Sequence, residues 1–265
     1  MKKPPVIEFK NVSIIQDLKT NKKILDIDSL VIMPEEDVVI LGPNGSGKST
    51  LIKLIYRLYY PEISKKPVVC RIFGNDRWNV FELRSMMGIV TPDLQANFEG
   101  DFTVKETVLS GFFSSLGLYN ENITAEMNRK TLNAMEFLGI NEFSGRKMTE
   151  VSTGEARLAL IARALVHNPK VLVLDEPTNG LDIKAAHKFR KHLSKVAAAG
   201  TNIILITHDL EDIIPEIKRV IMLKEGKVFR DGKIGEILTS QNLKTLFDIE
   251  ASVIKTKKGF KTEIG

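Results

Sequence analysis

Cysteine is nearly absent from this chain of 265 residues, since Cys70 is the only one. A single cysteine excludes an internal disulfide and predicts a reducing compartment. Long apolar segments are absent as well, because runs such as VVIL and VLVL fall far short of the ~20 residues that span a membrane. The opening MKKPPVIEFK has two lysines but no apolar stretch behind them, so we do not expect a signal peptide. These absences predict a cytoplasmic protein, peripheral on the cytoplasmic face of a membrane only where another chain holds it there.

Internal repeats and low-complexity tracts are also absent. Hydrophobic residues make up 43% of the chain, which is enough for a substantial core and suits one large domain. The net charge of +5 is a mild excess that suits an anionic ligand without requiring one. The basic segment KTKKGFK near the C-terminus is expected to be a solvated hairpin rather than a nucleic-acid surface, so we do not expect direct nucleic-acid binding.

Short runs rich in β-branched residues recur along the chain, and several are apolar throughout rather than alternating. Such runs are typical of parallel strands that are covered on both faces. Helical patterns such as STLIKLIYRLYY and IKAAHKFRKHLSKVAAAG lie between them. Alternating strands and helices predict an α/β fold with a mostly parallel sheet. The expected strands are VIEFKNVSII, DVVILG, MMGIV, KVLVLDE, NIILITH and RVIMLKEG.

Residues 92–166 interrupt this alternation, because they offer helical patterns and no good strand. We therefore predict a single domain of residues 1–265, with an α/β core of residues 1–91 and 167–236 and an inserted helical subdomain of residues 92–166. Residues 237–265 are expected to form a short helix and a hairpin with its turn at Lys258-Gly259.

The segment GPNGSGKS, from Gly42 to Ser49, matches the P-loop pattern G-x-x-x-x-G-K-[ST] at every fixed position, between a predicted strand and a predicted helix. Its glycines let main-chain N–H groups converge on phosphates, Lys48 supplies a positive charge, and the Ser49 hydroxyl is placed to bind Mg²⁺. A glycine-rich turn that binds nothing is the alternative, and the complete match in the right context disfavours it. The expected nucleotide-binding residues are Gly42, Pro43, Asn44, Gly45, Ser46, Gly47, Lys48, Ser49 and Thr50.

Two adjacent carboxylates follow the predicted strand VLVL, and a histidine follows the predicted strand in ITHD. Ligands of open α/β sheets bind at the carboxyl ends of the strands, so these side chains lie at the expected edge. Asp175 is the natural partner of Mg²⁺, and Glu176 can act as general base toward an attacking water. We expect His208 to contact a γ-phosphate. A solvated acid pair before a proline turn would be the better interpretation of Asp175 and Glu176 without the P-loop.

The segment VSTGE precedes the apolar run ARLALIARAL and has the pattern of a capping box, with Ser152 as N-cap and Glu155 three residues later. A serine, a glycine and a helix N-terminus also suit the binding of a phosphate. The two interpretations describe one device, because the helix N-terminus that needs a cap also presents N–H groups to an anion. If Glu155 turns back to its own N-cap, its charge avoids the phosphate.

Together the motifs GPNGSGKST, VSTGEARLALIARALVHNPKVLVLDEPTNGLD and ITHD resemble the nucleotide-binding domains of ABC-type ATPases in order and spacing, over nearly the whole chain. The resemblance implies a RecA-like P-loop NTPase core with an inserted helical subdomain, the ligands ATP and Mg²⁺, ATP hydrolysis, and a head-to-tail dimer around two nucleotides. It implies that VSTGE is the signature motif, which holds the γ-phosphate of an ATP on the partner's P-loop through Ser152, Thr153, Gly154 and Glu155.

The resemblance also assigns roles to single residues. It makes Asp175 the Walker B aspartate and Glu176 the catalytic glutamate. His208 is similar to the switch histidine, and Asp182 is similar to the D-loop residue that crosses the dimer interface. It also places Lys48 among the catalytic residues.

Three features depart from the family pattern. Thr153 occupies a position where glycine is usual. Pro92 stands where the Q-loop glutamine is expected, so Gln95 is the candidate for that catalytic and Mg²⁺-binding role. The displaced loop and STGE resemble the ModF/YlmA-like branch of ABC ATPases. The end of the first strand offers Ile14 or Ile15 in place of an aromatic residue that would stack on adenine, so the choice between ATP and GTP stays open.

These motifs leave three candidate functions for the chain. The first is the motor subunit of a membrane transporter with a separate permease, coupled through the Gln95 loop. The second is a soluble, stand-alone ABC ATPase that acts on nucleic acid or a protein complex. A nucleotide-binding regulator without turnover is disfavoured, because no catalytic position is lost. The single nucleotide-binding domain favours the transporter, and the unusual Q-loop favours the stand-alone ATPase.

Overall fold

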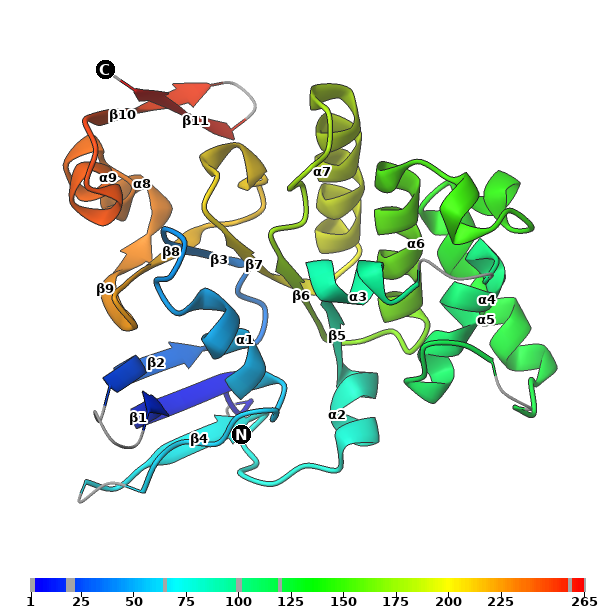
Figure 1. Ribbon diagram of the computed structural model, residues 1–265, viewed down its shortest axis with the longest axis horizontal. Coiled ribbons are helices and arrows are strands. Elements are labelled where there is room, and N and C mark those ends of the chain that lie inside the picture. The colour runs from blue at the N-terminus through cyan, green and yellow to red at the C-terminus, as the bar shows by residue number, and fades with distance from the viewer. Residues whose placement is uncertain are drawn as a thin grey trace. The chain divides into compact units, whose positions relative to one another are not determined.

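The computed structural model describes residues 3–17, 22–63, 66–98, 102–118, 121–256 and 259–264. The chain divides into two compact units. Unit 1 comprises Met1–Val80 and Asn202–Gly265, and unit 2 comprises Phe81–Thr201. Figure 1 labels the elements of both units. None of the helices in the described ranges has the length and apolar character that crossing a membrane requires.

One sheet of unit 1 is antiparallel, with the strand order β2-β1-β4. These strands are β1 (Ile7–Asp17), β2 (Lys22–Ile32) and β4 (Val69–Ile72). In β1, the side chains of Ile7, Phe9 and Val12 are fully buried, whereas Lys10 is exposed. This alternation is typical of a strand with one covered face. The first predicted strand is therefore confirmed, but it lies in an antiparallel sheet that the sequence pattern did not separate from the parallel strands.

The parallel strands of unit 1 carry the P-loop. In this unit β3 (Val38–Leu41) pairs in parallel with β7 (Asn202–Thr207) and β8 (Arg219–Lys224). All four residues of β3 are buried, as its apolar sequence predicts. The antiparallel strand β9 (Lys227–Lys233) pairs with β8, and helix α1 (Lys48–Ile55) follows β3 after the P-loop.

The C-terminal part of unit 1 contains α8 (Ile234–Ile237), α9 (Ser240–Phe247), β10 (Ala251–Thr256) and β11 (Gly259–Ile264). The strands β10 and β11 form the predicted hairpin, in which Thr256 is the register partner of Gly259. Lys258, the first residue of the predicted turn, lies outside the described residues. The short helix η4 (Leu210–Asp212) follows β7.

Unit 2 contains two parallel strands, β5 (Met87–Val90) and β6 (Val171–Asp175), and most of the helices. The helices are α2 (Val80–Met86), α3 (Pro92–Ala96), α4 (Val104–Leu109), α5 (Ala125–Phe137), α6 (Thr153–Leu165) and α7 (Ile183–Ala198), with short 3₁₀ segments η1 (Ser110–Phe113), η2 (Asn141–Phe143) and η3 (Met148–Glu150). Within the described part of residues 92–166, the structure contains helices and no strand, which agrees with the sequence pattern. The predicted subdomain boundaries at residues 92 and 166 stay a prediction.

Helix α6 forms the centre of the helices in unit 2. Eight of its residues are buried, among them Leu158, Leu160 and Ile161. Helices α4 and α5 lie beside it in Figure 1. Gly88 of β5 allows α6 to approach closely, because a Cβ atom at this position would lie 3.0 Å from the main-chain oxygen of Ala164. The core of this unit therefore holds α6 firmly against its neighbours.

Candidate nucleotide site

The P-loop has the backbone that its glycines allow. Gly45 and Gly47 have φ angles of 79° and 101°, in the left-handed region that disfavours other residues. A Cβ atom on Gly47 would lie 3.0 Å from the main-chain oxygen of Ile24, whereas a Cβ atom on Gly45 would meet nothing within 4 Å. The loop is therefore packed against β2 at Gly47 and open at Gly45, where a ligand can approach the main chain.

Lys48 and Ser46 place polar groups at this loop. The Lys48 side chain is only 6% exposed, and its ammonium group donates hydrogen bonds to the main-chain oxygens of Gly42 (2.7 Å) and Pro43 (3.0 Å). Ser46 is 2% exposed, and its hydroxyl has no hydrogen-bond partner among the described residues. Buried polar groups are normally bonded, so an unpartnered hydroxyl and a buried ammonium at the mouth of a glycine loop fit a phosphate ligand.

His208 lies beside the P-loop in unit 1. Because β3 and β7 are parallel neighbours, Leu41 is the register partner of Thr207, and the N–H of Gly42 donates to the oxygen of Thr207 at 3.3 Å. The exposed residue His208 follows directly. Asp212, which is 2% exposed, accepts a hydrogen bond from the Thr207 hydroxyl at 2.9 Å. The structure thus brings the P-loop and His208 together and braces the turn after β7.

In unit 2, Asp175 is the last residue of β6, and Glu176 follows it. Glu176 has a φ angle of 45°, which is uncommon for a residue with a Cβ atom. The buried Arg157 donates hydrogen bonds to the main-chain oxygens of Glu176 (3.2 Å) and Pro177 (2.5 Å). The turn that carries both predicted acids is therefore tied to α6, a contact that the sequence did not suggest.

Gln95 is placed by the pairing of β5 with β6. Val90 is the register partner of Leu174, so the carboxyl ends of the two strands coincide. Helix α3, which includes Gln95, begins two residues after β5 ends. The chain therefore enters α3 from the sheet edge at which β6 ends with Asp175, and the side chain of Gln95 lies outside the described part of the chain.

The segment from Ser152 to Glu155 forms the capping box that the sequence predicts. Ser152 is the N-cap of α6, and its hydroxyl accepts a hydrogen bond from the N–H of Glu155 at 3.3 Å. The Glu155 carboxylate accepts hydrogen bonds from the N–H and from the hydroxyl of Ser152, both at 2.8 Å. Glu155 therefore turns back to its own N-cap, as the hypothesis required.

The charge of Glu155 is stabilised where it lies. Burial raises the pKa of this carboxyl, but the hydrogen bonds from Ser152 and the positive charges of Lys188 and Arg146 outweigh burial and lower the pKa below its ordinary value. The carboxylate is thus ionised at neutral pH and compensated by groups of its own unit.

Asp182 is the N-cap of α7, and its carboxylate accepts a hydrogen bond from the N–H of Ala185 at 2.8 Å. This contact is a sufficient structural reason for an aspartate at that position. The predicted D-loop role across a dimer interface stays a prediction.

Ile14, one of the two candidates for a contact with the nucleotide base, is 6% exposed and packs in the core of unit 1, whereas Ile15 is half-buried. A side chain in the core is not available to a base. Of the two isoleucines, only Ile15 retains exposed surface.

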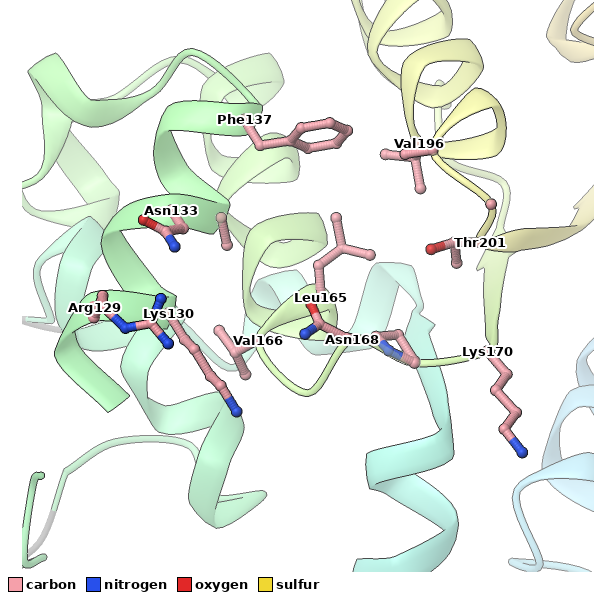
Figure 2. A pocket seen from close by; sticks show the side chains of 14 residues that line it. Arg129, Lys130, Asn133, Phe137, Leu165, Val166, Asn168, Lys170, Val196 and Thr201 are labelled. Carbon is pink, nitrogen blue, oxygen red and sulfur yellow. The ribbon is translucent and has the colours of Figure 1, made fainter. Parts of the chain in front are cut away.

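A cavity of about 630 Å³ lies within unit 2, away from these residues. Figure 2 shows Arg129, Lys130 and Asn133 on α5, Val196 on α7 and Lys170 just before β6 around it. The guanidinium of Arg129 is already bonded to Glu126, at 2.7 and 2.9 Å. None of the predicted site residues lines this cavity, so it is not the predicted nucleotide site.

Within the described residues, no group of three or more His, Cys, Asp or Glu side chains could hold a metal ion.

Comparison with known proteins identifies the family. The sequence profile described as ABC transporter matches residues 25–179, which is more than half of the chain. An uncharacterised ABC transporter ATP-binding protein, YlmA of Bacillus subtilis, is 34% identical over 94% of this chain and 93% of its own length. The hemin import ATP-binding protein HmuV of Bradyrhizobium diazoefficiens is 31% identical over 87% of this chain and 85% of its own.

Comparison with solved structures supports the same family assignment. The structure of CbiO1 from Clostridium perfringens, part of an ABC transporter complex, covers 91% of this chain and 93% of its own, with 26% identity and a TM-score of 0.75. A dimeric ATP-binding cassette bound to ADP and phosphate covers 86% of this chain and 98% of its own, with 27% identity and a TM-score of 0.69. The RecA-like α/β fold and the resemblance to the YlmA-like branch are therefore confirmed. The chain belongs to the ABC transporter family and is one of its ATP-binding, ATP-hydrolysing proteins.

Proposed function

We propose that this chain is the motor subunit of a membrane transporter. Two copies, or this chain and a similar one, would close head to tail around two ATP molecules, and hydrolysis would drive a separate transmembrane permease at the cytoplasmic face of the membrane. The observation that carries the proposal is the P-loop, which combines the buried ammonium of Lys48, the unpartnered hydroxyl of Ser46 and a main chain that is open at Gly45.

The relatives with an assigned role support the link to transport. One is named for hemin import. The energy-coupling factor transporter ATP-binding protein EcfA2 of Thermotoga maritima is 33% identical over 88% of this chain and 84% of its own. The alternative, a stand-alone ATPase that acts on nucleic acid or a protein complex, finds no support among these relatives.

We assign a different role to the core and to the helical subdomain. The core, residues 1–91 and 167–236, would bind the nucleotide, and the helical subdomain, residues 92–166, would present the signature motif to the partner's nucleotide. Gln95, which follows β5 at the start of that subdomain, would connect the permease to the catalytic core.

The P-loop would hold the phosphates of the ligand. The main chain of residues 42–47, the ammonium of Lys48 and the N–H of Thr50 would bind the phosphates of ATP. Ser49, Asp175 and Gln95 would hold Mg²⁺, which supplies charge neutralisation of the phosphate oxygens when bound.

Hydrolysis would be an in-line attack of water on the γ-phosphate. Glu176 would orient this water and accept its proton, while His208 would contact the γ-phosphate from the end of β7. The partner's copies of Ser152, Thr153, Gly154 and Glu155 would close the site, and Asp182 would cross the interface.

Substitution of Lys48 tests the nucleotide site. Lys48→Ala should weaken ATP binding at least 100-fold in calorimetry, because the triphosphate loses a buried cation. Lys53→Ala on the exposed side of the same helix is the matched control, and its ATP affinity should stay within twofold of wild type. Equal affinities for wild type and Lys48→Ala would show that the P-loop is not the site.

A second experiment tests the sandwich. Glu176→Gln removes the base but keeps the P-loop, so hydrolysis should fall by roughly 10²–10⁴ while ATP still binds. Light scattering should then show an ATP-dependent dimer for this variant, and a mostly monomeric wild type under turnover. A Glu176→Gln protein that remains monomeric at saturating ATP and hydrolyses at the wild-type rate would overturn both assignments.

The transporter role is tested with candidate permeases in detergent or vesicles. Wild type should change its ATPase rate when its permease is added, and Gln95→Ala should still bind ATP but lose that response. ATPase activity that responds to no membrane partner, and instead to nucleic acid or a soluble complex, would replace the transporter proposal.

A further inference from the structure

Arg157 is a buried cation in the middle of an apolar helix. It lies on α6, five residues after Ser152, and its side chain is 8% exposed. Its neighbours along the helix, Ala156 and Leu158, are buried as well. Burial of a guanidinium is costly unless its N–H groups are well bonded, so its hydrogen bonds indicate what it stabilises.

Two hydrogen bonds of Arg157 go to the main chain of one turn. Its Nη1 donates to the oxygen of Glu176 at 3.2 Å and to the oxygen of Pro177 at 2.5 Å. The oxygen of Glu176 also accepts from the N–H of Asn179 at 3.2 Å. Two consecutive carbonyl groups thus point at one guanidinium, which fixes the orientation of both peptide planes.

This turn needs such support. Glu176 has a φ angle of 45°, a conformation that costs free energy for any residue with a Cβ atom and persists only when the surroundings enforce it. Proline after Glu176 restricts the turn further. The direction of the Glu176 side chain depends on this backbone, so the bonds from Arg157 set where its carboxylate points.

We infer that Arg157 is a positioning residue that connects the signature helix to the catalytic turn of the same chain. The inference rests on the proposed function, in which Ser152 serves the partner's nucleotide and Glu176 serves the chain's own. Five residues of helix rise about 7.5 Å, so Ser152 and Arg157 move together as one rigid element. Contact of the signature motif with the partner's ATP would then adjust Glu176 in the other half of the sandwich.

The variants are Arg157→Gln, which removes the charge and the fork of donors, and Arg157→Lys, which keeps a charge and a donor. Arg163→Gln is the matched control. Arg163 lies on the same helix and also donates to a main-chain oxygen, that of Ser115 at 2.9 Å, and to the hydroxyl of Ser110 at 3.1 Å; neither acceptor belongs to the turn after β6. All variants are first checked for folding by circular dichroism and thermal denaturation.

For Arg157→Gln we expect a fall of kcat by tenfold or more with an ATP affinity within about threefold of wild type, since the P-loop is untouched. Arg157→Lys should recover at least a third of the wild-type kcat. Whatever its effect on stability, Arg163→Gln should keep a kcat per folded molecule within twofold of wild type. A folded Arg157→Gln protein with wild-type kcat, or an Arg163→Gln protein with the same loss of kcat, would overturn the inference.

The connection itself is tested by a double substitution. Ser152→Ala should lower kcat strongly in wild type and by a clearly smaller factor in Arg157→Gln, because the route from the signature to Glu176 is already broken. Equal factors in both backgrounds would contradict the connection. If wild type does not hydrolyse ATP, or Glu176→Gln hydrolyses normally, the proposed function fails; if both behave as expected and only the Arg157 results differ, this inference alone fails.

Discussion

Replacement of Glu155 by glutamine restores the uncharged side chain that the signature motif of the family usually carries. In this chain the carboxylate accepts two hydrogen bonds of 2.8 Å from Ser152. Glutamine keeps one acceptor oxygen and can retain the capping box, but it removes the negative charge. The substitution therefore separates the effect of that charge on ATP from the effect of the cap on the helix.

The two possible positions of the charge predict very different results. Two like charges 4 Å apart interact by about 4 kcal/mol at an effective dielectric constant of about 20, which corresponds to roughly a 10³-fold change in affinity. A carboxylate that faced the partner's γ-phosphate would therefore weaken binding severely. Because the Glu155 carboxylate is turned to Ser152 and lies near Lys188 and Arg146, we expect a change in ATP affinity of less than about threefold.

The cost of the substitution should appear in stability instead. A hydrogen bond to a charged acceptor contributes about 1.5–3 kcal/mol, against about 1 for a neutral one, and solvent screening at an exposed cap reduces the difference to about 0.5–1 kcal/mol. For a protein of this size, Tm should fall by roughly 1–4 °C. The pKa of Glu155 is lowered in the folded state, so this contribution is fully present above the ordinary carboxyl value and is lost as the pH falls through the folded value.

The assay is ATP-dependent dimerisation of Glu176→Gln with and without Glu155→Gln, followed by light scattering, together with thermal denaturation. Glu150→Gln is the matched control, because Glu150 also accepts a hydrogen bond from a main-chain N–H, that of Lys147 at 3.0 Å. The control variant also removes one negative charge, at a position five residues earlier in the sequence. A tenfold or greater gain in ATP affinity for Glu155→Gln, absent from Glu150→Gln, would refute the reasoning, and so would a Tm difference that persists at pH values well below the carboxyl range.

Three further results are expected. Gly42→Ala should abolish ATP binding, because its Cβ atom would lie 2.4 Å from a main-chain oxygen of β8 and must displace the loop; wild-type affinity in calorimetry would contradict this. Asp37→Asn should leave Tm at pH 7 unchanged or higher, because burial raises the pKa of Asp37 and the amide oxygen can still accept from Ile203; the advantage should shrink on acidification, and a loss of Tm at pH 7 would count against it. Gly154→Ala should keep fold and ATP affinity, because a Cβ atom would make only ordinary contact with Ala185 at 3.4 Å, but it should weaken the ATP-dependent dimer; an undiminished dimer would show that no phosphate approaches there.

The sequence predicted those elements of the fold whose formation depends on the residues within the element itself. Nearly all residues of the strands β3, β6 and β7 are buried, and their apolar sequences predict buried strands. By contrast, β2 and β9 carry charged residues among their apolar ones, and neither was expected as a strand. The antiparallel pairing of β1 with β2 and β4 was missed for another reason, because which strands pair depends on contacts far apart in the sequence.

The same distinction applies to the site. The P-loop and the capping box are short segments whose backbone follows from residues within a few positions, so both were predictable. The bonds of Arg157 join positions 19 and 20 residues apart, and only the packing of α6 near the end of β6 brings them together. One signal was present, since an arginine among residues that are apolar all round a helix must find partners inside the protein.

The structure of residues 152–155 explains why a threonine in place of the usual glycine need not prevent phosphate binding. Thr153 does not adopt a positive φ angle and its side chain is exposed, so the backbone there does not demand glycine. The hydroxyl of Ser152 is already engaged with Glu155, both as donor and as acceptor. The N–H groups of Thr153 and Gly154, the first two of α6, have no acceptor within the helix, and they are the donors that remain for an anion. Recognition of the partner's phosphate in this chain would therefore rest on the main chain of the helix N-terminus, which tolerates a change of side chain at Thr153.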